Sequence, residues 1–350
     1  MRRTIPITFV TIIILSFTQC QKEEKVIVPV NVPAGKGHDL LSEYHFFEGD
    51  IKSLTANEVS GVLPYDLNVA LFSDYASKLR FIYVPEGSTI RYDTAEILDM
   101  PVGTVLIKHF YFFNSENNQN NIETRLLIKR ENDWQPEIYE WNETQTDAKR
   151  TVIGGTQKIT ANIKGQNRTL NYLVPNQNQC KNCHNFDGKL IPIGPRIHNL
   201  NKDYTYTEGR RNQLEKWQSS GFLSTVNVST APSWPKIDDM VNSLNSRARA
   251  YLAVNCASCH SRHGSAANSG LYLEYNTRDS LQLGFWKGPV AAGNGSGNLN
   301  YVIHPGKAEQ SILLFRMISD KVEERMPEIG RELPHEEGIA LIREWIDSQK

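Results

Sequence analysis

The sequence CKNCH at Cys180–His184 returns as CASCH at Cys256–His260. Each copy has the pattern C-x-x-C-H, in which two cysteines three residues apart are followed directly by a histidine. Residues three apart lie on the same side of a helix, so one turn presents both thiols together. The chain has five cysteines, and the two motifs contain four of them. The cysteines therefore do not predict a long disulfide framework.

The C-x-x-C-H pattern is the attachment signature of a c-type haem. The two thiols add to the vinyl groups of one porphyrin, and the neutral histidine ligates its iron. A thioredoxin-like site would accompany a βαβ pattern, which neither copy shows, and a zinc site gives no reason for a histidine at this place twice. The residues predicted to hold two covalent haem c groups are Cys180, Cys183, His184, Cys256, Cys259 and His260.

The second motif lies among segments with helical spacing. Val241, Leu244, Ala248 and Tyr251 recur at that spacing just before it, which predicts a helix leading to Cys256. Residues 308–319 and 334–349 predict two more helices after the motif. This order of helix, motif, loop and closing helix is that of a small cytochrome c.

Met326, in the stretch RMPEIG, is the predicted distal ligand of the second iron, since it stands where a cytochrome c supplies a thioether. The alternative is that Met326 only packs. Met317 lies in an apolar helical pattern and is predicted to be a core residue. His263, His304 and His335 are the alternatives for bis-histidine ligation.

The first motif is followed by Gly194 and Pro195, and a backbone carbonyl of such a turn is expected to accept the Nδ1 proton of His184. A plain turn is the alternative. The distal ligand of the first iron stays open at this point. His198 and Met240 are in reach along the chain, and a residue of the N-terminal domain or an open site are the other possibilities.

The N-terminus has two arginines, an apolar run and then Cys20, which is the order of a secretion signal. We expect residues 1–19 to be a signal peptide and Cys20 to be lipidated, with residues 20–44 as a tether. An ordinary signal or an N-terminal anchor is the alternative. The protein is thus predicted to be exported and anchored to a bacterial membrane, the outer membrane being favoured.

Between residues 45 and 175, short segments rich in Val, Ile, Thr, Phe and Tyr alternate with polar turns, which is typical of a β-sandwich or barrel. Residues 63–80 lack a clear period and are a candidate packing surface for the first haem. The predicted fold is multidomain α+β. A β-rich domain over 45–175 precedes two all-α cytochrome c-like haem domains, over 176–237 and 238–350. The helix expected in the first of these carries Leu214 and Trp217.

The chain resembles a family of bacterial dihaem c-type cytochromes whose role is largely unassigned. The matching stretches include LPYDLNVALFSDYASKLRFIYVPEG, VPNQNQCKNCHN, RARAYLAVNCASCH, YVIHPGKAEQSILLFRM and HEEGIALIREWI. The resemblance covers nearly everything after residue 45 and implies haem c at both motifs, but it implies no substrate.

The expected function is electron transfer between redox proteins outside the cytoplasm, rather than a stand-alone enzyme. A dihaem peroxidase-like or other haem oxidoreductase is the alternative, although the two motifs are closer together here than is usual in those peroxidases. A redox subunit that docks on a dehydrogenase through the β-rich domain is another. The 38 basic and 39 acidic residues balance, which gives no sign of a nucleic-acid partner.

Overall fold

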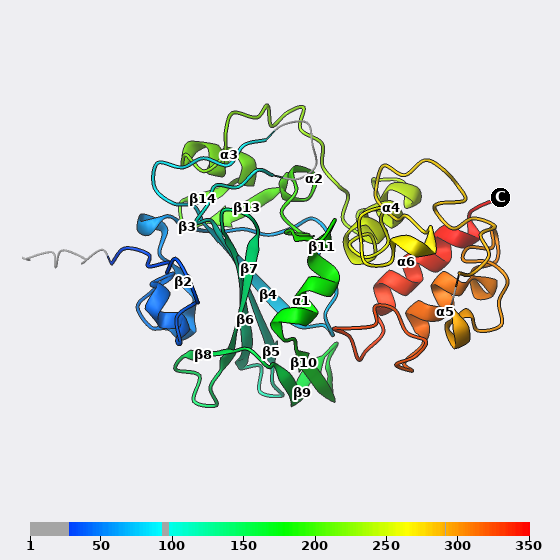
Figure 1. The fold of residues 1–350 in the computed structure, drawn as a ribbon, viewed down its shortest axis with the longest axis horizontal. Helices are drawn as coiled ribbons and strands as arrows, with labels where there is room; N and C mark the ends of the chain where they lie inside the picture. Colours follow the sequence, from blue (N-terminus) through cyan, green and yellow to red (C-terminus); the bar gives the residue numbers. More distant parts are fainter. Residues whose placement is uncertain (1–27, 93–97, 291) are drawn as a thin grey trace, which may run out of the picture.

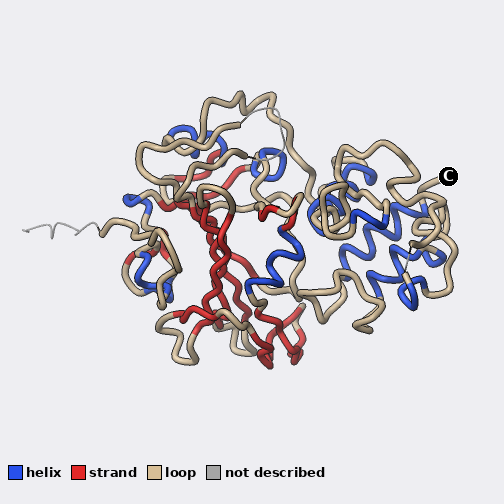
Figure 2. The backbone as a smooth tube through the Cα atoms, viewed as in Figure 1, coloured by secondary structure: helices blue, strands red, loops and turns tan. Residues whose placement is uncertain are grey.

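The computed structural model describes residues 28–92, 98–290 and 292–350. The strands are β1 (Phe47–Glu48), β2 (Thr55–Ala56), β3 (Val62–Pro64), β4 (Ser77–Tyr83), β5 (Val105–Phe113), β6 (Gln119–Lys129), β7 (Trp134–Trp141), β8 (Ala148–Thr151), β9 (Gly155–Ile163), β10 (Gln166–Val174), β11 (Asn185–Phe186), β12 (Lys189–Leu190), β13 (Asp203–Tyr206) and β14 (Gly209–Asn212). The helices are α1 (Gln177–His184), α2 (Ile197–Leu200), α3 (Gln213–Ser219), α4 (Leu244–Asn255), α5 (Ile312–Ile318) and α6 (Glu336–Asp347). Figures 1 and 2 show the strands gathered in one half of the molecule and α4, α5 and α6 in the other.

The main sheet is an antiparallel meander of six strands in the order β3-β4-β5-β6-β7-β8. Each strand pairs with the next along the chain, as short polar turns between apolar segments allow. On β5 the side chains of Ile107 and Leu106 are both buried although they point to opposite faces. The sheet is therefore covered on both sides.

One face of the sheet packs against the N-terminal segment. Leu41, Tyr44 and Phe46 of that segment join Ile107 and Leu126 of the sheet in one core cluster. The other face carries two further clusters, one with α2 and α3 and one with the β9–β10 hairpin. This second face also meets α1, so it is the face on which the first motif lies (Figure 1).

The predicted fold class was wrong, because two all-α cytochrome c-like domains are not evident and the chain is mostly β-rich. After the first motif, α2 and α3 are short and alternate with the β11–β12 and β13–β14 hairpins. Leu200, Leu214 and Trp217 are fully buried, but they pack in one cluster with Ile82 and Leu106 of the sheet. Helical spacing therefore identified the buried side chains correctly, but these side chains pack against a sheet instead of against other helices.

The second-motif region has helices at its two ends and irregular chain between them. The predicted helices before and after the motif are confirmed as α4, α5 and α6. The core of the second-motif region contains Ala248, Tyr251, Ile342 and Trp345. Val241, which was expected on the helix before the motif, lies outside α4 and is exposed. Among the described residues between Cys256 and Ser311, the helical segments are 3-10 turns only, so this region is not an all-α domain either.

No helix within the described ranges is long and apolar enough to cross a membrane. The predicted signal peptide over residues 1–19 and the predicted lipidation at Cys20 lie outside the described residues.

Candidate functional site

Helix α1 holds the first motif against the sheet. It begins after Asn176, whose side chain accepts from the Gln179 backbone N–H at 2.8 Å, while the Gln179 side chain accepts from the Asn176 N–H at 2.9 Å. This reciprocal capping box satisfies two backbone donors at the start of the helix. The Gln177 amide then donates to the Pro136 carbonyl of β7 at 3.0 Å. Cys180 and Cys183 therefore sit one turn apart on a helix tied to the sheet.

His184 ends α1 with a defined ring orientation. Its Nδ1 lies 2.7 Å from the Ile191 carbonyl oxygen, and because a carbonyl can only accept, Nδ1 carries the proton. The Nε2 lone pair is then available as an iron ligand. Burial lowers the pKa of His184 to about 4, so the ring is neutral. The carbonyl was expected at Gly194 or Pro195 instead, but the chain reverses earlier, at the β11–β12 hairpin.

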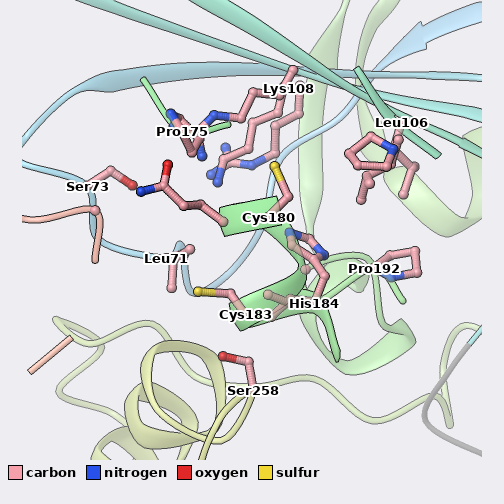
Figure 3. Close-up of a pocket in the computed structure, with 18 of the residues that line it drawn as sticks. Leu71, Ser73, Leu106, Lys108, Pro175, Cys180, Cys183, His184, Pro192 and Ser258 are labelled. Carbon is pink, nitrogen blue, oxygen red and sulfur yellow. The ribbon is translucent and has the colours of Figure 1, made fainter. Parts of the chain in front are cut away.

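A cavity of about 190 Å³ opens beside the first motif. Its walls are α1, the sheet face and residues from the 63–80 segment, among them Leu67, Leu71 and Phe72. The segment expected as a candidate packing surface for the first haem therefore lies beside the first motif, and its contact with a haem stays a prediction. In Figure 3, Lys108 lies on the sheet side of the cavity and Cys180 and His184 lie on the α1 side.

Three cations of the sheet also line this cavity, and sequence reasoning missed them. Arg80, Lys108 and Arg125 come from β4, β5 and β6. The one signal in the sequence is a lysine inside the apolar strand TVLIKHFYFF, at an alternating position whose neighbours face a core.

Neither proposed distal ligand of the first iron reaches the first cavity. His198 lies beside Trp234, with ring centroids 5.5 Å apart, and is not among the lining residues. Met240 is 75% exposed and lines neither of the two cavities at the motifs. Among the described lining residues of the first cavity, His184 is the one histidine and there is no methionine.

The second motif lies in the turn that follows α4. The backbone N–H groups of Cys259 and His260 both donate to the Cys256 carbonyl, at 3.2 and 2.9 Å. The Ser269 hydroxyl lies 3.4 Å from the His260 Nδ1, a long hydrogen bond compared with that of the first motif. Burial lowers the pKa of His260 to about 4, so this ring is neutral as well.

A larger cavity, of about 480 Å³, opens beside His260. Met326 lines it, and so do Met317 and His335, which gives three residues of types that can ligate iron. Met317 is buried on α5, as expected for a core residue, and Met326 is half-buried. His335 stacks on Phe72 with ring centroids 4.3 Å apart.

The other two histidines considered for bis-histidine ligation lie outside this cavity. His263 pairs with Asp187 at 2.7 Å, and His304 packs against the rings of Trp286 and Tyr301. Met326, Met317 and His335 are therefore all candidates for the distal ligand of the second iron.

The two motifs meet in space although they are far apart in the chain. Cys183 and Cys259 line both cavities, and the interaction between their thiols raises the pKa of Cys183 and lowers that of Cys259. The Asn182 carbonyl oxygen lies 3.5 Å from the Cys259 sulfur and accepts from the Ser265 hydroxyl at 3.1 Å. The residues lining both cavities are Phe72, Cys183, Asn255, Cys259, Pro327 and Ile329. The two cavities are therefore neighbours with a common wall.

These residues fit the chemistry of covalent haem. Each motif presents two thiols and one neutral imidazole beside a largely apolar cavity. The second cavity lies within the roughly 300–1,000 Å³ range of cofactor pockets and the first lies below it. A haem at the first motif therefore requires the lining side chains to move outward. In the described part of the chain, no group of three or more His, Cys, Asp or Glu side chains is arranged to hold a bare metal ion.

No protein-family model matches the chain, and neither the curated proteins nor the solved structures include a match to it.

Proposed function

We propose that the protein is a dihaem c-type cytochrome that transfers electrons between redox partners outside the cytoplasm. The observation that carries the proposal is the contact between the two C-x-x-C-H motifs, whose cavities share a wall. Two covalent haems attached there would sit next to each other, and neighbouring redox groups suit the passage of single electrons. Bound haem supplies one-electron redox chemistry at its iron.

The chain contributes attachment, orientation and shielding. Cys180 and Cys183 on α1, and Cys256 and Cys259 after α4, would form the thioethers. The hydrogen bond from His184 to Ile191 holds the ring in the tautomer that leaves Nε2 free. Apolar side chains of both cavities exclude water, which favours the less charged, reduced form of a haem.

At the second motif, a thioether ligand would raise the potential relative to bis-histidine ligation. Met326 lines the same cavity as His260, as this role requires. Met326 would in that case make the site at the second motif the more oxidising of the two.

Two other functions have an observation in their favour. Cys183 and Cys259, which line both cavities, are two neighbouring thiols of the kind that a redox-active dithiol would present. The first cavity, without a methionine or a second histidine among its described lining residues, is what an open haem in a peroxidase-like enzyme would need. The electron carrier is preferred over the redox-active dithiol because both motifs include a histidine, which a dithiol does not use.

The test is a pyridine haemochrome spectrum with intact mass on protein matured in a host that attaches haem c. The expected result is two covalent haems per chain and a mass increase of two haem groups. A colourless protein that is two hydrogens lighter contradicts the proposal and supports a Cys183–Cys259 disulfide. Two haems with peroxide turnover would replace the carrier with the enzyme.

The remaining parts of the proposal concern location and partners. Export and a lipid anchor at Cys20 are proposed from the N-terminal sequence alone. Haem attachment to C-x-x-C-H motifs in an exported chain is consistent with them. Radiolabelled palmitate incorporation that is lost in Cys20→Ala tests the anchor, and unchanged labelling would contradict it.

A further inference from the structure

The second cavity has more positive than negative charge in its wall. The charged side chains of the described lining are Lys287, Arg316, Arg331 and Glu328. The histidines in the lining, His260 and His335, are neutral, because burial lowers the pKa of each to about 4. Three cations and one carboxylate therefore leave an excess of two positive charges.

Arg331 is fully engaged with the backbone at the end of α5. It is 4% exposed, and its guanidinium donates to the carbonyls of Arg316 and Met317 at 3.2 and 3.0 Å and also to the carbonyl of Ser319. The last carbonyls of a helix lack partners inside the helix, so these bonds satisfy them. Arg331 thus holds the end of α5, and with it the backbone of Arg316, in place.

The Arg316 guanidinium is half-buried and has unused donors. Its Nε donates to the Glu324 carbonyl at 2.8 Å, but within the described ranges its two terminal nitrogens have no hydrogen bond or ion pair. Burial lowers the pKa of Arg316 and the charge of the exposed Glu328 partly offsets this, although the two side chains form no ion pair. The guanidinium therefore still lacks a direct anionic partner.

A glycine gives the Arg316 guanidinium its place. Gly295 lies in the 3-10 turn Gly293–Ser296, and a Cβ there would be 2.9 Å from the Arg316 Cζ. A side chain at this position would push the guanidinium away, whereas glycine lets it rest on the backbone. The turn thus fixes where the unused donors of Arg316 lie.

The Lys287 ammonium likewise has no anionic partner. Lys287 is half-buried, and a Cβ at Gly270 would lie 3.2 Å from its Nζ, so the ammonium lies beside the Gly270 backbone. In the part of the chain that the structure describes, this ammonium makes no hydrogen bond or ion pair. The second cavity therefore has two cations, from separate parts of the chain, whose charges are not paired.

These two cations lie away from the wall that the two cavities share. Cys259 is on the shared wall, whereas neither Lys287 nor Arg316 lines the first cavity. The vinyl groups that react with Cys256 and Cys259 and the two propionates are on opposite edges of a haem. A haem attached at the second motif would therefore direct its propionates away from the shared wall, into the part of the cavity with unpaired cations.

We propose that Arg316 and Lys287 bind the two propionates of a haem attached at the second motif, and that Arg331 positions Arg316. The inference rests on the proposed function in that this haem is attached at Cys256 and Cys259. It goes further by naming the residues that neutralise its carboxylates. Two propionates balance the excess of two positive charges, and hydrogen bonds from guanidinium or ammonium groups to carboxylates are among the strongest in proteins.

The experiment compares matured, full-length wild type with Arg316→Gln and Lys287→Gln, which remove one charge each. The matched controls are Arg210→Gln, at a 74% exposed side chain on β14, and Lys149→Gln, at an exposed residue on β8. Covalent haem is counted by pyridine haemochrome. The propionate bending mode is recorded by resonance Raman spectroscopy, and both redox steps are titrated potentiometrically over a range of pH.

The expected result is two haems per chain in every variant, because thioether attachment does not use these cations. Arg316→Gln and Lys287→Gln should each shift the propionate mode and weaken the ionisation of one propionate about tenfold or more, through the loss of one charge-assisted hydrogen bond. One redox step should then fall in potential as pH rises through the propionate pKa, because an ionised carboxylate stabilises oxidised iron. It should be the step that is missing in Cys256→Ala/Cys259→Ala. Both controls should match wild type.

Two further variants separate the charge from its placement. Arg316→Lys keeps the charge and should restore most of the wild-type pH dependence. Gly295→Ala displaces the guanidinium while the charge stays, and it should change the propionate mode in the same direction as Arg316→Gln. Its control is Gly155→Ala, where an added Cβ meets nothing within 4 Å.

An unchanged propionate mode and an unchanged pH dependence in both Arg316→Gln and Lys287→Gln overturn the inference, and equal shifts of both redox steps do so as well. If Arg316→Gln does not fold, Lys287→Gln decides alone. Two haems with unchanged propionates leave the proposed function standing and remove this site. A colourless wild-type protein overturns both.

Discussion

The two C-x-x-C-H motifs have the same pattern but different surroundings. The first lies on α1 against a sheet and faces a cavity of about 190 Å³ with three cations in its wall. The second lies in turns after α4 and faces a cavity of about 480 Å³, whose wall also contains three cations but adds Met317, Met326 and His335 to the motif histidine. The motif would fix the cofactor, whereas the surroundings decide which ligand, charge and potential it receives. The predictions below test that difference.

The largest effect is expected when either pair of cysteines is removed. Cys180→Ala/Cys183→Ala and Cys256→Ala/Cys259→Ala should each reduce covalent haem from two per chain to one. The second variant should also lower the thermal midpoint more, because a larger unfilled cavity costs more stability. Pyridine haemochrome and a thermal melt measure both quantities. If one variant loses both haems, maturation at the two motifs is coupled and they are not independent sites.

The next largest effect is expected for mutations in the hydrophobic cores of the two halves. Trp217 packs beside the sheet and Trp345 packs on α6, and both are fully buried. Replacing either by Ala should cost about 3–5 kcal/mol. Because Asp74 accepts from the backbone of Glu332 and Leu333 across the two halves, we expect one shared urea transition.

Circular dichroism and haem absorbance measure that transition. Trp286→Ala is the control, since Trp286 is about half exposed and should cost little. Two separate transitions, each shifted by one variant only, would show that the halves unfold independently.

A smaller and more local effect is expected for the iron ligand of the second motif. Met326→Ala should lower the potential of one haem by on the order of 0.1 V, a fraction of the roughly 0.8 V over which axial ligands move haem potentials. It should also remove the weak red absorption band of methionine-ligated oxidised haem. Met317→Leu is the control. Loss of the band in the control alone would assign the ligand to Met317, and no band in wild type would favour His335.

The smallest effect is expected at the surface contact between the motif regions. The Nδ1 of His263 lies 2.7 Å from an Asp187 carboxylate oxygen, and both side chains are exposed. Asp187→Asn should therefore cost less than about 1 kcal/mol in urea unfolding. Asp203→Asn, which removes the exposed pair with Arg210, is a control far from the motifs and should behave alike. A loss of stability well above that of the control would mean that the contact between Asp187 and His263 holds the two motif regions together.

Much of the local structure followed from sequence patterns. Short segments rich in β-branched and aromatic residues, separated by polar turns, predicted β4 to β7 and β10, and helical spacing predicted α3 to α6. The packing partner of α3 could not be predicted from the sequence. Helical spacing indicates that the side chains of Leu214 and Trp217 are buried, but it does not show which element covers them. The outcome was a shared core with the sheet rather than a separate helical domain.

The candidate site was predictable in part. The six motif residues could be chosen from spacing alone, whereas their meeting at Cys183 and Cys259 depends on contacts between distant parts of the chain. Lys108 was missed because a single charged residue in an apolar strand has no meaning until its register partners are known. The acceptor for His184 was misplaced because it depends on the exact position of a turn.

The described chain enters at one extremity of the molecule and leaves at the other (Figure 1). If Cys20 carries a lipid, the β-rich half stands between the bilayer and α6. The two motifs, whose cavities share a wall, would then lie between the β-rich half and α6, held away from the lipid surface.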